Sequence, residues 1–230
     1  MKKTLFTIEF IFVLVLFVFP YFLPAFSSAE VQLIEMKVTL SGFMMFFWAV
    51  LLFIFNFSLY REKQIRLCEE KNMVSGFLAL KDFRLHCYVL VAAGLIFIIS
   101  AVCTGLEFWL ASKGFSFPQL VSVMPEGFSL WASFACAVLM SSFFEETVYR
   151  FFIPDGLQVL FNGKFTPLTE ICALLFFSLG HRYLGIPGVL NAVLSGAVLR
   201  LLFVKTRSIW INTLVHAFYN STVYLMAAMM

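Results

Sequence analysis

Two adjacent glutamates, Glu145 and Glu146, lie at the end of an apolar stretch that begins near Phe128 and is hydrophobic enough to enter a membrane. A carboxylate at the middle of a bilayer costs roughly 3 kcal/mol or more on insertion scales. Arg150 follows Glu146 by four residues, a spacing that puts two side chains on one face of a helix and suits a charge pair. Because ionisable residues inside a membrane are functional candidates by default, this pair is the first place to look for chemistry.

Three further polar residues lie in later apolar stretches. His181 follows Phe177 by four residues, and Asn220 follows His216 by the same interval. Each has a structural interpretation, since a single His or Asn often joins membrane helices by hydrogen bonds. The carboxylate–arginine pair could likewise serve only to lock its own helix. However, the occurrence of all these groups on three apolar stretches favours one shared site.

Such a set could hydrolyse a peptide bond. A glutamate can take a proton from water and return it to the leaving amine, while a neighbouring histidine orients or deprotonates the same water. A His–Asn pair can donate hydrogen bonds to the developing oxyanion. A glutamate with two histidines is also a plausible zinc set, which stays open as a minority alternative because the chain has no HExxH motif. Ser and Cys nucleophiles have little support, since there is no GxSxG motif and no paired Cys–His signal.

The composition indicates a membrane protein. Hydrophobic residues make up 62% of the 230-residue chain and charged residues 13%, against about 45–50% and about 25% in soluble domains. The net charge of +3 is small and argues against a nucleic-acid partner. The five cysteines are scattered and form no CxxC motif, so we interpret them as apolar core residues.

Seven apolar runs are long enough to be interpreted as spanning helices. The sequence therefore predicts an all-α, polytopic membrane helix bundle of about seven transmembrane helices, or eight with a re-entrant or interfacial segment. The first run has an alternative interpretation as a signal peptide, because Lys2 and Lys3 precede it and Ser27-Ser28-Ala29 follow it. The runs are 5–26, 38–60, 87–111, 128–153, 165–181, 189–204 and 209–229.

We expect a single membrane domain over residues 1–230. Residues 1–111 would form N-terminal spans with a basic loop at 61–86, and 128–225 would form a catalytic core. Basic residues fall on alternate loops, so the N-terminus is expected in the cytoplasm and the C-terminus outside. The localisation favoured is a bacterial inner membrane.

The three motifs together resemble those of the CPBP glutamic-type intramembrane proteases. They are Glu145-Glu146-x-x-x-Arg150, Phe177-x-x-x-His181 and His216-x-x-x-Asn220. This family includes the type II CAAX prenyl endopeptidases and the abortive-infection or bacteriocin self-immunity proteins. The resemblance covers about residues 128–225. Tyr149-Arg150-Phe151 departs from the family's frequent Phe-Arg-Gly.

The resemblance implies a role for each residue. Glu145 would be the general base, assisted by His181, and His216 with Asn220 would form the oxyanion hole. Glu146, Arg150 and Phe177 would support the site. No cofactor is implied, and the partners would be the lipid bilayer and a peptide or membrane-anchored protein substrate. For Glu145 to approach His181, either the fourth helix must extend past Arg150 or residues 151–161 must turn back into the protein.

Two non-proteolytic functions remain open. A catalytically inactive scaffold or immunity protein would keep the motifs and bind a partner in the membrane. A transporter or proton relay would use the buried carboxylates, although the chain shows no inverted repeats.

Overall fold

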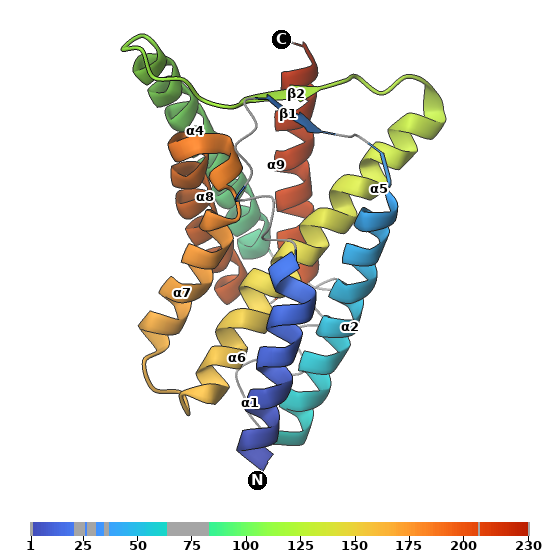
Figure 1. The fold of residues 1–230 in the computed structure, drawn as a ribbon, viewed down its shortest axis with the longest axis vertical. Helices are drawn as coiled ribbons and strands as arrows, with labels where there is room; N and C mark the ends of the chain where they lie inside the picture. Colours follow the sequence, from blue (N-terminus) through green and yellow to red (C-terminus); the bar gives the residue numbers. More distant parts are fainter. Residues whose placement is uncertain are drawn as a thin grey trace.

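The computed structural model describes residues 2–20, 26, 31–34, 37–63, 83–206 and 208–229. These residues form a bundle of helices with the N-terminus at one end and the C-terminus at the other (Figure 1). Three helical stretches in the described part of the chain are long and apolar enough to cross a membrane: Arg84–Ala111, Gly127–Leu160 and Arg182–Thr206. Two shorter apolar helices cover Gly42–Leu52 and Thr166–Leu179. The predicted class, an all-α membrane helix bundle, is confirmed, whereas helix length alone does not establish seven spans.

The helices begin and end close to the predicted runs. The first half contains α1 (Lys2–Val13) with the π-helical turn η1 (Leu14–Val18), then α2 (Leu40–Lys63) and α4 (Phe83–Ala111). The second half contains α5 (Gly127–Glu146), η4 (Thr147–Phe152), α6 (Ile153–Leu160), α7 (Thr166–Leu179), η5 (Arg182–Leu184), α8 (Gly185–Thr206) and α9 (Ile209–Met229). The interfacial helix considered for the 61–86 loop falls mainly on residues 64–82, which lie outside the described residues.

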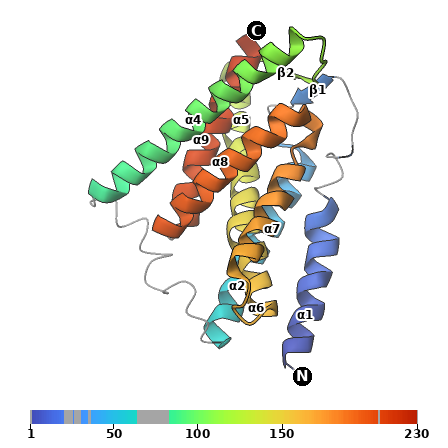
Figure 2. The same cartoon turned by 90° about the vertical axis from the view of Figure 1, so that its left-hand side faces the viewer.

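Two short strands, which were not predicted, join connections from different halves of the chain. β1 (Val31–Ile34) pairs in parallel with β2 (Gln119–Ser122), with Val31 opposite Gln119 and Ile34 opposite Ser122. The pair lies at the end of the bundle where the C-terminus lies (Figures 1 and 2). Four-residue strands so far apart in sequence pair only because the helices carry both connections to the same end.

The longest helix carries the two glutamates. The stretches α5, η4 and α6 form one helical run of 34 residues, Gly127–Leu160, about 50 Å at 1.5 Å per residue. The expected end near residue 153 was wrong, because Pro154 does not stop the helix. Proline has no N–H to donate to the carbonyl four residues earlier, which here belongs to Arg150. Arg200 of α8 donates to that carbonyl instead, from Nη1 at 2.6 Å.

Tight apolar packing surrounds η4. The largest core cluster contains Phe151 and Phe152 of η4 together with Phe10 of α1. The Phe10 and Phe152 rings stack at 5.0 Å between centroids. A Cβ at Gly156 would lie 2.1 Å from the Phe10 ring, so only glycine allows α1 to approach α6 this closely. The second cluster joins α4, α8 and α9, and the third joins α5 and α9.

Candidate active site

Glu146 is the most heavily engaged acid in the described part of the bundle. Its side chain is fully buried, and α9 supplies two of its partners. The His216 Nδ1 lies 2.8 Å from Oε1, and the Asn212 Nδ2 donates to Oε2 at 3.0 Å. The third partner is Arg150, whose Nε lies 3.2 Å from Oε2. That contact is an ion pair by distance, although the Arg150 Nε lies outside hydrogen-bond geometry. Glu146 is thus held by two side chains of α9 and by the guanidinium of Arg150 in η4.

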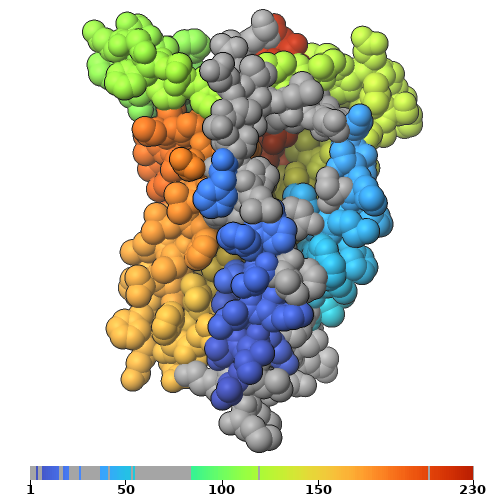
Figure 3. Space-filling model, viewed as in Figure 1, coloured from blue at the N-terminus to red at the C-terminus, as the bar shows by residue number. Residues whose placement is uncertain are grey.

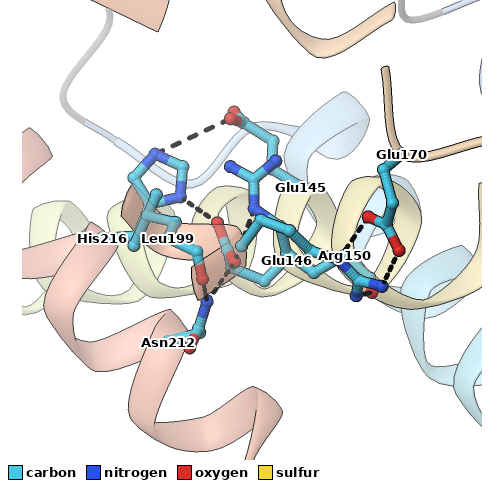
Figure 4. Close-up of polar contacts among 8 residues, drawn as sticks. Glu145, Glu146, Arg150, Glu170, Leu199, Asn212 and His216 are labelled. Carbon is cyan, nitrogen blue, oxygen red and sulfur yellow. Dashed lines mark hydrogen bonds and ion pairs between the residues drawn. The ribbon is translucent and has the colours of Figure 1, made fainter. Parts of the chain in front are cut away.

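Glu145 has a different environment, although it is the adjacent residue. Its side chain is 22% exposed, and its Oε2 lies 3.8 Å from the Nε2 of His216. That oxygen is buried and has no hydrogen-bond partner among the described residues. Figure 4 shows the Glu145 carboxylate beside one nitrogen of the His216 ring and the Glu146 carboxylate beside the other, with Asn212 at the edge of the group away from Glu145. The two glutamates therefore differ in what they can do, since only Glu145 has an oxygen free to bind a water or substrate.

His216 joins the two acids. Because the ion-paired Glu146 carboxylate accepts, the Nδ1 of His216 carries the proton and donates it. The Nε2 that faces Glu145 is then an acceptor in the neutral ring and a donor in the imidazolium. The protonation state of His216 therefore decides whether it can donate toward the side where Glu145 lies.

Arg150 and Phe177 support this group, as the spacing predicts for a shared site. The Arg150 side chain is 1% exposed, and its guanidinium carbon lies 4.3 Å from the centre of the Phe177 ring. The same ring lies 4.8 Å from His181 and 6.2 Å from His216, measured between centroids. Phe177 of α7 thus connects all three motifs by direct ring contacts.

His181 lies at the end of α7 but does not contact Glu145 directly in the described structure. Its Nδ1 lies 2.9 Å from the carbonyl oxygen of Phe177. A carbonyl only accepts, so Nδ1 carries the proton and Nε2 is left as an acceptor. The expectation that Glu145 faces His181 is corrected to this extent: the histidine in ion-pair distance of Glu145 is His216. The described residues bring together no group of three or more His, Cys, Asp or Glu that could hold a metal ion.

The two asparagines of α9 differ in their polar contacts, and the one with contacts to the site is not the one named from the sequence. Asn220 lies one helical turn beyond His216, is partly exposed, and makes no polar side-chain contact in the described part of the chain. Asn212 lies one turn before His216, is fully buried, and donates both to Glu146 and to the carbonyl of Leu199, at 2.7 Å. Sequence reasoning missed Asn212, although its spacing of four from His216 was a usable signal.

A second ion pair, also missed, holds the helix that carries the glutamates. The Nε of Arg200 donates to Glu170 Oε2 at 2.6 Å, while its Nη1 donates to the Arg150 carbonyl. Gln158 donates to the same carboxylate at 3.3 Å. These contacts tie α7 and α8 to the π-helical turn.

Comparisons with known proteins agree with this geometry. Residues 127–222 match the family model of the type II CAAX prenyl endopeptidases, Rce1-like, which is a protease family. Neither the curated proteins nor the solved structures contain a significant match to the chain. The apolar helices and the family together indicate an integral membrane protein. The match includes every residue of the three motifs and confirms that residues 127–222 resemble the Rce1-like type II CAAX prenyl endopeptidases.

Proposed function

We propose that this protein is an intramembrane endopeptidase that hydrolyses a peptide bond with water activated by Glu145. The observation that carries the proposal is the contrast between the adjacent acids. Glu146 is buried and held by Arg150, Asn212 and His216, whereas Glu145 keeps an unpartnered carboxylate oxygen and is 22% exposed.

In the proposed reaction, a water bound to Glu145 gives a proton to the carboxylate while its oxygen attacks the peptide carbonyl carbon. The new C–O bond converts the carbonyl oxygen into an oxyanion. Glu145 then returns the proton to the amide nitrogen as the C–N bond breaks, which leaves a carboxylic acid and an amine. No covalent intermediate with the protein is required.

The histidines and Asn220 fit supporting roles in this reaction. In the neutral ring the Nε2 of His181 is an acceptor, and in the proposed reaction it orients the attacking water. The Nε2 of His216 donates to the oxyanion when the ring is an imidazolium. Asn220, one turn away on α9, has an amide free to donate beside it.

The direct test is Glu145→Gln, which keeps the shape of the side chain and removes the base. We expect loss of peptide hydrolysis by the purified protein in lipid nanodiscs, assayed with a library of quenched fluorogenic peptides. The matched control is Glu126→Gln, at the exposed start of the same helix, which should hydrolyse as the wild type does. Wild-type activity in Glu145→Gln would refute the glutamate mechanism.

A zinc chelator distinguishes the proposed mechanism from a zinc-dependent protease. Since Glu145 acts on water directly in the proposed reaction, we expect hydrolysis to continue after dialysis against a strong zinc chelator. Loss of activity that added zinc restores would contradict the proposed mechanism and favour a metal-dependent protease.

A further inference from the structure

The surroundings of Glu145 are closed toward one end of the bundle. From Ser142 to Gly156, every residue of the long helix is buried except Glu145. In α9, the residues from Ile211 to Thr213 and from Val215 to Ala217 are buried as well. Aromatic rings of the largest core cluster, including Phe151 and Phe152, fill this part of the bundle. A peptide arriving from that end would have to displace a packed core.

Toward the other end the same helices are open. Between Gly127 and Ser141, only Phe134 and Val138 are buried, and no residue from Phe218 to Met229 is buried. Ser141, one turn from Glu145 in this direction, is partly exposed, whereas Tyr149, one turn in the opposite direction, is buried. The exposure of Glu145 therefore arises on the side of the β1–β2 pair.

Groups at that end interact with Glu145. Its carboxylate interacts electrostatically with the hydroxyls of Tyr183 in η5 and Tyr224 in α9, as it does with Tyr149 of η4 on the closed side. Tyr183 and Tyr224 are partly exposed, whereas Tyr149 is buried. In Figure 3, parts of α5 and α9 are visible beside α2, below the β1–β2 end of the bundle. Phenolic hydroxyls here could hydrogen-bond to a peptide backbone that reaches Glu145.

The basic residues identify which side of the membrane this end faces. Among the described residues, the loops and helix ends at the opposite, closed end carry seven lysines and arginines, whereas the β1–β2 end carries three; Arg150 and Arg200 lie inside the bundle. Such an excess marks the cytoplasmic side. The seven are Lys2, Lys3, Arg61, Lys63, Arg84, Lys164 and Lys205, and the three are Lys37, Lys113 and Arg182.

We infer that Glu145 is reached from the extracytoplasmic side of the membrane. Resting on the proposed function, this assigns the substrate class: a peptide segment on the outer side, either a translocated peptide or the outer part of a membrane protein. A cytoplasmic C-terminal tail would meet the packed core around η4 instead.

Cysteine labelling tests the direction of access without requiring catalysis. The five native cysteines are replaced by alanine or serine, and Ser141→Cys is introduced, a change that adds little volume. Reference variants are Ser112→Cys at the exposed end of α4 and Lys205→Cys at the exposed end of α8. A membrane-impermeant thiosulfonate is applied to sealed right-side-out and inverted vesicles, and folding is checked by thermal stability.

We expect Ser141→Cys to be labelled from the side that labels Ser112→Cys and several-fold more slowly from the side that labels Lys205→Cys. Tyr224→Cys, farther out on α9, should follow the same pattern and replaces Ser141→Cys if that variant does not fold. Labelling from the Lys205 side would overturn the inference, as would no labelling from either side in a folded variant.

A second measurement separates this inference from the proposed function. The same reagent, added from the Ser112 side, should block peptide hydrolysis by Ser141→Cys and leave the cysteine-free parent active. If labelling is one-sided as expected but the parent shows no hydrolysis with any peptide, the proposed function fails while the direction of access stands.

Discussion

The contrast between Glu145 and Glu146 makes a quantitative prediction about stability. Glu146→Gln removes the negative charge from a fully buried carboxylate and leaves the guanidinium of Arg150, 1% exposed, without a counter-charge. Removing one partner of a buried ion pair typically costs about 3–5 kcal/mol. For a chain of this size that corresponds to a fall in the melting temperature of roughly 6–20 °C.

Glu145→Gln should behave differently. The Glu145 carboxylate is 22% exposed and lies 3.8 Å from the Nε2 of His216. Partly exposed pairs of this kind contribute about 0–1 kcal/mol. We therefore expect Glu145→Gln to unfold within a few degrees of the wild type while losing peptide hydrolysis.

The assay is thermal unfolding of both variants in the same lipid nanodiscs, followed by intrinsic fluorescence. A double variant, Glu146→Gln with Arg150→Met, supplies the internal control. Because neither charge is then left alone in the core, the double variant should be more stable than Glu146→Gln, with a coupling energy of about 0.5–3 kcal/mol. Equal melting temperatures for the two single variants would refute the division between a supporting and a reacting glutamate.

Two further substitutions test the elements that hold the site. Asn212→Ala removes two buried hydrogen bonds, to the Glu146 carboxylate and to the Leu199 carbonyl, so we expect a loss of about 1–3 kcal/mol, measured by thermal unfolding; a melting temperature equal to that of the wild type would contradict the buried contact. Gly156→Ala puts a methyl group 2.1 Å from the ring of Phe10 and should destabilise the protein by about 1–3 kcal/mol. Its control, Gly105→Ala, meets nothing within 4 Å and should show no loss, so equal effects of the two changes would argue against close packing of α1 on α6.

The membrane class and the contact between Glu146 and Arg150 could be predicted from the sequence, because both depend on local signals. Long apolar runs identify helices, and a polar residue inside such a run is conspicuous whatever its partner. Intervals of four residues also place side chains on one helical face, which is why the Glu146–Arg150 contact was predictable.

The pairing of groups from different helices could not be predicted in the same way. Which histidine lies beside Glu145 depends on the rotation and depth of α7 and α9, and intervals within one helix carry no information about either. The sequence analysis predicted His181 near Glu145, and the histidine that the structure places within ion-pair distance of Glu145 is His216. Asn212 was overlooked for a related reason, since near the start of its helix it resembles an ordinary residue at a helix end until Glu146 is placed against it.

Pro154 illustrates how a local rule is overridden by a residue from elsewhere. Proline in a helix deprives the carbonyl four residues earlier of its donor, and in an apolar core that unpaired carbonyl would favour ending the helix. Arg200 donates to the carbonyl of Arg150 while its own charge is balanced by Glu170, so the helix can continue through Pro154 to Leu160. The cost of the proline is thereby offset beside the glutamates, where η4 adopts π-helical geometry.

Such π-helical turns are frequent at functional sites, and here the turn carries Arg150 toward both Glu146 and the Phe177 ring. The orientation of the candidate site therefore depends on an ion pair that lies outside all three sequence motifs.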